Sequence, residues 1–366
     1  MYIKNISLKN FRNYSSLNVS FSRNMNVFIG ANAQGKTNLL ESIFLCAMGK
    51  SFKYVSEKEI IKIGEKFSDV RISYVSEGRD MENRVCLFTD KKKVVWVNDV
   101  PLHKLSELIG KLTVVIFTPE ELSLIKDGPF ARRRFLDMLI SQVRPKYMRI
   151  LSDYNKVLER KNKLLKDIVL KPELKETISI WNSQLAEYGA EIIKYRMDFI
   201  KNVLSKAEKI HLEISGNTEK LTGKYKTADV NLKDRENLRE NLIKILEENE
   251  EREILLRQAV IGPHRDDVIF YLNDKNVKIF GSQGQQRTVV LSLKLAQKEI
   301  FFSETGENPI LLLDDITGEL DISRREYLFS KIKDSQVFIT CTDSDRTPEK
   351  GGEKYFRIVN GNIPER

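Results

Sequence analysis

The sequence is poor in the residues that build disulfide frameworks, metal centres and membrane spans. Only three cysteines occur in 366 residues, Cys46, Cys86 and Cys341, and they lack C-x-x-C spacing, so neither a disulfide scaffold nor a zinc site is indicated. No apolar run approaches the ~20 residues that a membrane-spanning helix needs. Lys4 and Lys9 fall where a signal peptide would have its apolar segment. We therefore expect a cytoplasmic protein with no membrane association.

Histidine is equally scarce, and the positive charges outnumber the negative ones. His103, His211 and His264 are scattered, which predicts no metal cluster. The 61 Lys and Arg exceed the 52 Asp and Glu, which gives a net charge of +9 and a pI near 9.2. This balance suits a polyanion such as DNA as partner, although a lysine-rich solvated surface would give the same composition. The length allows roughly two or three domains.

A phosphate-binding loop is the most informative motif in the chain. It fits the P-loop pattern G-x-x-x-x-G-K-[ST], with the apolar run Val27–Ile29 before it and a helical apolar pattern after it. Lys36 is expected to reach the β- and γ-phosphates of ATP, and Thr37 to bind Mg²⁺. The predicted nucleotide-binding residues are Gly30, Ala31, Asn32, Ala33, Gln34, Gly35, Lys36 and Thr37.

An acidic strand far along the chain supplies the second part of a nucleotide site. Four apolar residues, Ile310–Leu313, precede Asp314 and Asp315, which is typical of a buried strand that ends in carboxylates, as in a Walker B motif. Asp314 would hold Mg²⁺ and Asp315 would orient or deprotonate the attacking water. Aspartates also cap strands without any function, so the P-loop in the same chain is what favours the catalytic interpretation. Lys36, Asp314 and Asp315 are therefore the predicted catalytic residues.

A third motif resembles the signature of ABC-type ATPases. Ser282, Gln283, Gly284 and Gln285 precede an amphipathic helical pattern and lie about thirty residues before the acidic strand. At a helix N-terminus they could bind the γ-phosphate of ATP held by a second copy of the chain. An N-capped helix after a turn is an equally good local interpretation. Downstream, Glu319, Leu320 and Asp321 resemble a D-loop.

The pattern along the chain predicts an α/β ATPase head with an antiparallel β layer and an inserted helical arm. We expect the N-terminal part of the head over residues 1–118, the arm over 119–261, and the C-terminal part of the head over 262–366. In the arm, apolar residues at helical spacing over 178–199 predict one helix of a short antiparallel pair, whose partner carries Leu151, Tyr154, Leu158 and Leu165. A globular helical domain with an amphipathic stripe remains an alternative.

Smaller elements are predicted near the C-terminal half of the head. Two strands, 268–271 and 277–280, are expected to flank a turn at Asn273-Asp274. Thr347–Gly352 is expected to be a polar loop and Tyr355–Val359 a final strand. His264 is expected to join the polar network of the head.

Three segments together resemble the RecF family of bacterial recombination mediators, whose heads are similar to those of SMC proteins. They are Leu8–Tyr14, Gly128–Asp137 and Gly262–Asp267. The resemblance implies an ATP-dependent homodimer on double-stranded and gapped DNA, and cooperation with RecO and RecR in loading RecA during repair of single-strand gaps. It also implies that Arg12 approaches the phosphates, although a surface charge on a hairpin would look the same.

The head departs from transporter-type ABC ATPases at three places. Asp315 stands where those proteins have Glu, Thr340-Cys341-Thr342 replaces the switch His, and Phe117–Glu120 lacks a clear Gln. These changes predict slow ATP hydrolysis, which the resemblance implies is stimulated by DNA, and they weigh against the alternative of a transporter subunit that drives a membrane partner. A nuclease with a similar head would need a further catalytic domain.

The candidates for DNA contact are basic residues that occur in short runs. Each run could equally be a solvated face. About five phosphate contacts would give a log–log salt slope near −4.5. The candidates are Lys50, Lys53, Lys91, Lys92, Lys93, Arg132, Arg133 and Arg134.

Overall fold

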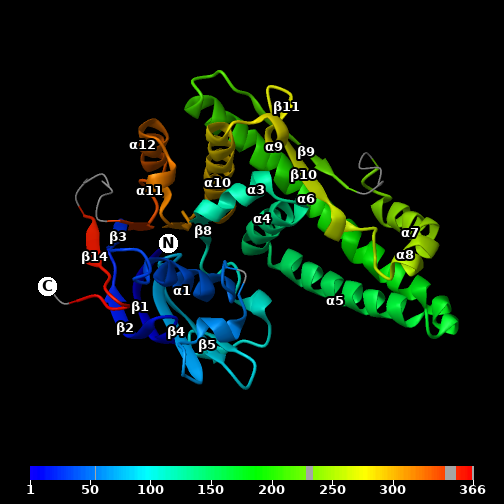
Figure 1. Cartoon of the computed structure of the whole chain (residues 1–366), viewed down its shortest axis with the longest axis horizontal. Helices are drawn as coiled ribbons and strands as arrows, with labels where there is room; N and C mark the ends of the chain where they lie inside the picture. Colours follow the sequence, from blue (N-terminus) through cyan, green and yellow to red (C-terminus); the bar gives the residue numbers. More distant parts are fainter. Residues whose placement is uncertain (54, 228–233, 343–351, 365–366) are drawn as a thin grey trace. The chain divides into compact units, whose positions relative to one another are not determined.

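The computed structural model of the chain describes residues 1–53, 55–227, 234–342 and 352–364 (Figure 1). The chain forms two compact units, which are described separately. Unit 1 contains Met1–Leu122, Glu213–Gly216 and Arg287–Arg366, and unit 2 contains Ser123–Leu212 and Asn217–Gln286. Residues 262–286, which we expected in the head, therefore lie in unit 2. None of the helices in the described part of the chain combines the length and apolar character that a membrane span requires.

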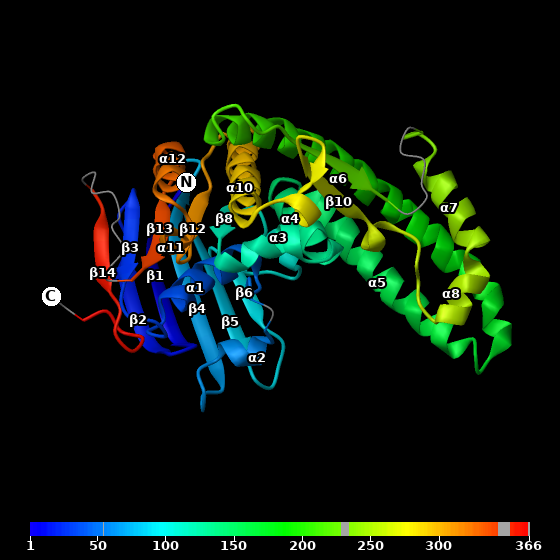
Figure 2. The ribbon, with the colours of Figure 1, turned by 45° about the horizontal axis from the view of Figure 1, so that its top comes forward.

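A five-stranded parallel sheet forms the centre of unit 1. Its strands follow the order β14-β3-β13-β12-β8 (Figure 2). Their bounds are β3 (Met25–Ile29), β8 (Val114–Phe117), β12 (Ile310–Leu313), β13 (Val337–Cys341) and β14 (Lys354–Arg357). Every residue of β8, β12 and β13 is buried, as continuous apolar runs predict for strands covered on both faces. Because all five strands are parallel, their carboxyl ends meet at one edge of the sheet.

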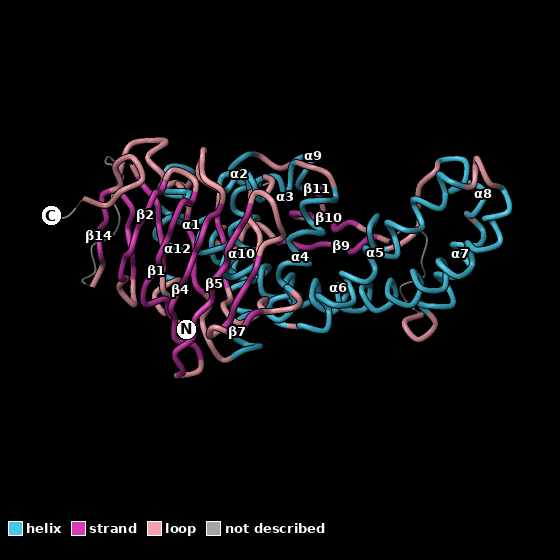
Figure 3. The backbone as a smooth tube through the Cα atoms, turned by 90° about the horizontal axis from the view of Figure 1, so that it is seen from below, coloured by secondary structure: helices cyan, strands magenta, loops and turns pink. Residues whose placement is uncertain are grey.

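A second sheet of unit 1 is antiparallel, as predicted. The strand order is β2-β1-β4-β5-β6-β7, and Figure 3 shows the longer strands β2, β1, β4 and β5 side by side. Alternating burial of Ile6 and Leu8, and of Leu17 and Val19, faces one side of this sheet toward the core. The strands are β1 (Tyr2–Phe11), β2 (Tyr14–Ser20), β4 (Phe67–Ser76), β5 (Arg79–Phe88), β6 (Val94–Val97) and β7 (Val100–Pro101).

Helix α1 (Lys36–Met48) lies between the two sheets and contacts both. Most of its residues are buried, because apolar side chains cover every face of the helix. This position fixes the helix N-terminus at the carboxyl edge of the parallel sheet. The remaining helices of unit 1 are α2 (Glu57–Ile60), η1 (Leu105–Glu107), η2 (Pro119–Leu122), α11 (Ile316–Glu319) and α12 (Ile322–Lys331), and α10 (Gln283–Thr305) enters this unit at Arg287.

Unit 2 is mainly helical and contains the predicted antiparallel pair, α5 (Pro145–Asp167) and α6 (Ile178–Ile214). Near the start of α5 the Tyr147 ring contacts Tyr195, and near its end Lys161 donates to Asn182, so the two helices run in opposite directions. The other elements are α3 (Ser123–Lys126), α4 (Pro129–Val143), η3 (Pro172–Thr177), β9 (Leu221–Lys226), α7 (Leu238–Glu248), α8 (Glu250–Leu256), η4 (Pro263–Arg265), β10 (Asp267–Leu272), β11 (Lys275–Asn276) and α9 (Val277–Phe280).

Two predictions about unit 2 were wrong in detail. Helix α6 has 37 residues and continues past Phe199, because buried apolar positions recur as far as Ile210. Residues 277–280 form helix α9 rather than a strand, since the Asn276 side chain accepts a hydrogen bond from Lys278 N and caps a helical turn. The turn at Asn273-Asp274 is present.

Of the two elements predicted near the C-terminus, the strand lies within the described residues and the loop lies mostly outside them. Strand β14 confirms most of the predicted final strand. Of the predicted polar loop, only Gly352 is described, and residues 347–351 lie outside the described residues.

Candidate nucleotide-binding site

The P-loop occupies the predicted position between a buried strand and a buried helix. It follows β3, and α1 begins at Lys36. Gly35 has φ 113° and Ala33 has φ 64°, so the chain turns sharply before it enters the helix. The backbone N–H groups of the first helical turn have no partner within the helix, which makes this end suitable for anions.

The Lys36 side chain is folded onto its own loop. It is buried, and its Nζ donates to the carbonyl oxygens of Gly30 at 2.6 Å and Ala31 at 3.2 Å. These partners are neutral, so phosphate oxygens are stronger acceptors for the ammonium group. The arrangement keeps the positively charged ammonium group within the loop, where a phosphate can replace the two carbonyl groups as its hydrogen-bond partner.

The P-loop and the acidic strand meet as the sequence predicted. The Thr37 Oγ1 donates to Asp314 Oδ1 at 2.8 Å, across 277 residues of sequence. Burial raises the pKa of Asp314 above its usual value and the neighbouring Asp315 raises it further, whereas the hydroxyls of Thr340 and Thr37 oppose this shift.

A hydroxyl and a carboxylate are the donors that Mg²⁺ takes from proteins when phosphates complete its coordination. Among the described residues, no three His, Cys, Asp or Glu side chains gather to hold a metal. The Thr37 and Asp314 pair therefore fits a magnesium ion that is bound together with a nucleotide.

Thr340 joins the two aspartates. Its Oγ1 accepts from Asp315 N at 2.9 Å and lies 2.8 Å from Asp314 Oδ1 and 3.5 Å from Asp315 Oδ1. One hydroxyl has one proton, so the shorter contact identifies Asp314 as its acceptor. The Thr340 hydroxyl, at the position of the switch His of transporter-type heads, is thus engaged with Asp314. Asp315 has φ 47° and is the N-cap residue that precedes α11.

Arg12 is held by a buried carboxylate that the sequence reasoning missed. Its guanidinium donates to both oxygens of Glu41, at 3.0 and 2.6 Å, and to the carbonyl of Glu59. Glu41 is fully buried on α1 and also binds Ser51 Oγ, with Lys53 Nζ 3.6 Å away. A charged residue within an apolar helix was the available signal.

The signature segment begins helix α10 with a reciprocal cap. Gln285 N donates to Ser282 Oγ at 3.2 Å, and Ser282 N donates to Gln285 Oε1 at 2.8 Å. The Gln285 side chain in turn donates to Glu219, whose other oxygen lies 3.1 Å from Nε2 of His211. Ser282 and Gln283 are exposed. This segment belongs to unit 2, whereas the P-loop belongs to unit 1.

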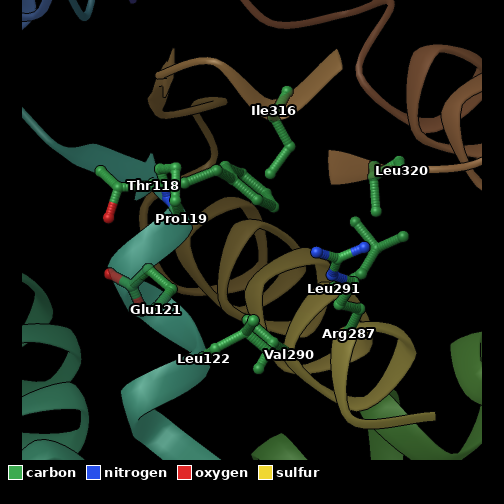
Figure 4. Close-up of a pocket in the computed structure, with 10 residues that line it drawn as sticks. Thr118, Pro119, Glu121, Leu122, Arg287, Val290, Leu291, Ile316 and Leu320 are labelled. Atoms are coloured by element: carbon green, nitrogen blue, oxygen red, sulfur yellow. The ribbon is translucent and has the colours of Figure 1, made fainter. Parts of the chain in front are cut away.

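The predicted D-loop lies beside a small, mainly apolar pocket of unit 1. Figure 4 shows Ile316 and Leu320 projecting into this pocket opposite Val290 and Arg287 of α10, with Leu122 on a third side. Glu319 ends α11, and the Asp321 side chain caps α12 by accepting from Arg324 N at 2.9 Å.

The predicted DNA contacts differ in how far they are available. Lys50, Lys91 and Lys92 are exposed, whereas Lys53 donates to Asn38 and Lys93 is paired with Glu57. All five lysines lie in unit 1, and the three arginines lie in unit 2.

The three candidate arginines of unit 2 differ in how far their side chains are buried. Arg132 is buried and forms an ion pair with Asp267, and the half-buried Arg133 donates to the carbonyl of Asp266. Arg134 is partly exposed. His264, which we expected in the head, also lies in unit 2.

Comparison with known proteins gives a consistent result along the whole chain. The family model described as the RecF/RecN/SMC N terminal domain matches residues 2–362. A protein of Acetivibrio thermocellus named DNA replication and repair protein RecF is 45% identical over 99% of both chains. A protein of the same name from Clostridium tetani is 40% identical over the full length of both chains.

Solved structures give the same result at the level of the fold. A structure described as the recombination mediator protein RecF-ATPrS in the RecFOR pathway has a TM-score of 0.92 and 36% identity, and the match covers 99% of this chain and 97% of that one. An SMC head bound to the C-winged helix domain of ScpA has a TM-score of 0.55 and 16% identity over 94% and 90% of the two chains, which shows a similar fold only.

Proposed function

This chain belongs to the RecF family, and we propose that it is an ATP-dependent DNA-binding protein that dimerises on DNA when ATP binds and that hydrolyses ATP slowly. It acts in recombinational repair at single-strand gaps, where it assists the loading of RecA together with RecO and RecR. The observation that carries this proposal is the 2.8 Å contact between Thr37 and Asp314, which unites the P-loop and the acidic strand at the edge where parallel sheets bind ligands.

In this proposal the P-loop holds the triphosphate. The N–H groups of Gly30–Thr37 bind phosphate oxygens, and Lys36 exchanges its two carbonyl partners for phosphate. Thr37 and Asp314 hold Mg²⁺, which supplies charge neutralisation on the phosphates when it is bound. Replacement of weak neutral acceptors by phosphate is what favours binding.

Asp315 is our candidate for orienting the attacking water. It is shorter than the Glu of transporter-type heads, which fits slow turnover. We expect Asp315→Asn to bind ATP normally and to lower steady-state hydrolysis by tenfold or more. Full hydrolysis by this variant would exclude the role.

The second copy supplies the signature segment. Ser282 and the amides near Gly284 lie at the start of a 23-residue helix, and the exposed Ser282 is available to another chain. Two heads would thus enclose two ATP molecules.

Sedimentation with a nonhydrolysable ATP analogue, with and without gapped DNA, tests the dimer. The parent should double its mass, Ser282→Arg should stay monomeric, and Ser303→Arg, at the exposed far end of the same helix, should behave as the parent. Dimerisation of Ser282→Arg to the same extent as the parent would contradict the proposal.

Among the candidate residues, we assign DNA binding to the exposed lysines of unit 1 in preference to the arginines of unit 2. Lys50, Lys91 and Lys92 are exposed to solvent, whereas Arg132 is buried and would have to leave Asp267 uncompensated. We therefore retain the three lysines as the leading contacts. No observation favours the alternative of a transporter subunit.

A further inference from the structure

A turn close to the C-terminus is bonded to the P-loop. We call residues Val359–Asn362 the C-terminal turn. Val359 and Asn362 exchange two backbone hydrogen bonds, at 2.9 and 3.0 Å, and the two central residues have φ 47° and 72°, as in a type I′ turn. The turn follows β14 at the edge of the parallel sheet, beside β3.

The contacts converge on Gln34 of the P-loop. Gly361 N donates to the backbone carbonyl of Gln34 at 3.0 Å, and Asn360 N donates to its side-chain Oε1 at 2.6 Å. The Asn13 side chain, from the hairpin between β1 and β2, donates to the same carbonyl at 2.8 Å. Gln34 is thus held from two segments that lie more than 20 and more than 300 residues away in the sequence.

Glycines allow these backbones to approach. A Cβ on Gly30 would lie 2.5 Å from the carbonyl oxygen of Ile358, and a Cβ on Gly361 would lie 2.6 Å from that of Asn13. Side chains at these positions would force the segments apart. Gly30 is therefore needed for contact with the C-terminal segment as well as for access to phosphate.

The hydrogen bonds to Gln34 also fix the direction of a phosphate-binding group. In a planar trans peptide the carbonyl of Gln34 and the N–H of Gly35 point in opposite directions. A carbonyl bonded toward the C-terminal turn and Asn13 therefore orients the Gly35 N–H away from them. P-loops bind phosphate through such N–H groups, and a loop already held in the bound geometry loses less conformational freedom on binding.

We propose that the C-terminal turn is a positioning element for the nucleotide, which holds the P-loop in its phosphate-binding conformation before ATP arrives. The inference rests on the proposed nucleotide binding and is independent of dimerisation. Because the turn acts on the loop and not on the γ-phosphate, it strengthens the binding of ATP and ADP alike.

Two variants test the proposal without removing a phosphate ligand. Gly361→Ala places a methyl group against the Asn13 backbone, and Gln34→Met removes the acceptor of Asn360 N. Both should weaken the binding of ATP and of ADP about tenfold, and Gly361→Ala should leave kcat at saturating ATP within about twofold. The matched control is Gly306→Ala, at a glycine of φ 73° with nothing within 4 Å of its Cβ position, and it should leave both affinities unchanged.

Hydrogen exchange without nucleotide separates positioning from general destabilisation. Both variants should exchange faster in the peptide that covers residues 30–37 and remain slow in β12. Gln34→Glu, which keeps an acceptor oxygen, should restore slow exchange in residues 30–37.

Specific outcomes overturn the proposal. Nucleotide affinities within twofold of the parent in both variants would do so, as would faster exchange that extends equally to β12. If Gly361→Ala fails to fold, Gln34→Met decides alone. A parent protein that binds no ATP would instead overturn the proposed function, whereas a parent that binds ATP without dimerising leaves this inference intact.

Discussion

The nucleotide site of unit 1 and the buried ionic network of unit 2 are built from similar residues and differ in how those residues are paired. We use "ionic network" for Asp137, Arg196 and Asp266. In unit 1, Lys36 donates to backbone carbonyls and Asp314 accepts from hydroxyls, so charged groups have neutral partners. A ligand of opposite charge can replace such partners with a gain in free energy.

In the ionic network, groups of opposite charge already face one another within the chain. Arg196 is buried, donates to both oxygens of Asp137 and to the carbonyl of Pro263, and lies 3.6 Å from Asp266. The hydroxyl of Tyr225 donates to Asp266. The motif Gly262–Asp267, as prominent in the sequence as the P-loop, joins α4, α6 and β10, with Asp266 beside Arg196 and Asp267 paired with Arg132. A charge-rich motif is a candidate ligand site where its charged groups have only neutral partners within the chain. It is more often structural where they have partners of opposite charge.

The largest effect should come from breaking the ionic network. Arg196→Met leaves the buried Asp266 and the partly exposed Asp137 without their cation, which should lower the free energy of unfolding of unit 2 by roughly 3–5 kcal/mol. The chain has one tryptophan in each unit, Trp96 and Trp181, so Trp181 fluorescence in a Trp96→Phe background reports on unit 2 during urea denaturation. A loss below about 1 kcal/mol would show that the network is not structural.

Lys36→Met should have the opposite pattern. Because its ammonium has only neutral partners, its loss should change the free energy of unfolding by less than about 1 kcal/mol. ATP affinity should fall by about a hundredfold, since a buried charge-assisted contact to phosphate is lost. Calorimetric titration with ATP and urea denaturation together measure both quantities. If Lys36→Met instead unfolded unit 1 and left the ATP affinity unchanged, the proposed difference between the nucleotide site and the ionic network would be wrong.

A smaller effect should come from the histidine of unit 2. His264 Nε2 donates to the carbonyl of Ala259, so its Nδ1 accepts from the hydroxyl of Tyr154, and burial lowers the pKa of His264 to about 4. In the unfolded chain histidine titrates near 6.5. Below that pH the unfolded chain binds more protons, so stability is complete above about 6.5 and is lost as the pH falls toward 4.

We expect unit 2 to lose roughly 2 kcal/mol between pH 7 and pH 5 through this group. His264→Gln keeps a donor and an acceptor without titrating, and it should remove that part of the pH dependence. Urea denaturation followed by Trp181 fluorescence at both pH values is the measurement. An unchanged pH dependence in the variant would assign the effect to other groups.

The smallest effect should come from the surface lysines of unit 1. Lys91→Ala with Lys92→Ala should reduce the salt slope of DNA binding by about 1.8, because each phosphate contact contributes about 0.9. The control pair is Lys104→Ala with Lys111→Ala, at exposed lysines outside the candidate set. Equal slopes for the two pairs would place the DNA contacts elsewhere.

The sequence predicted the parts of the site whose signals are local. The P-loop spacing and the apolar run that ends in Asp314 each depend on a few neighbouring residues, and the structure has them where they were expected. The cap at Ser282 is also local, and it was the alternative interpretation of that segment. The same holds for the alternating strands of the antiparallel sheet.

The parts that were missed depend on contacts between distant segments. Gln34 and Gly361 are hundreds of residues apart, and no local pattern indicates that they meet. Glu41 was visible as an acid in an apolar helix, but its pairing with Arg12 was not. Residues 262–282 lie in unit 2, where β10 pairs with β9, and this pairing of two strands about forty residues apart is also a contact that local patterns do not indicate.

The central claim is that each ATP is shared between two copies of the chain, and mixing two inactive variants tests it most directly. In a mixed dimer of Lys36→Met and Ser282→Arg, one site combines both defects and the other is intact. Each variant alone should lack DNA-stimulated hydrolysis, and an equal mixture should recover up to about a quarter of the parent rate. A mixture that stays inactive, or a Ser282→Arg variant that hydrolyses ATP as fast as the parent does, would contradict the sharing of ATP between copies.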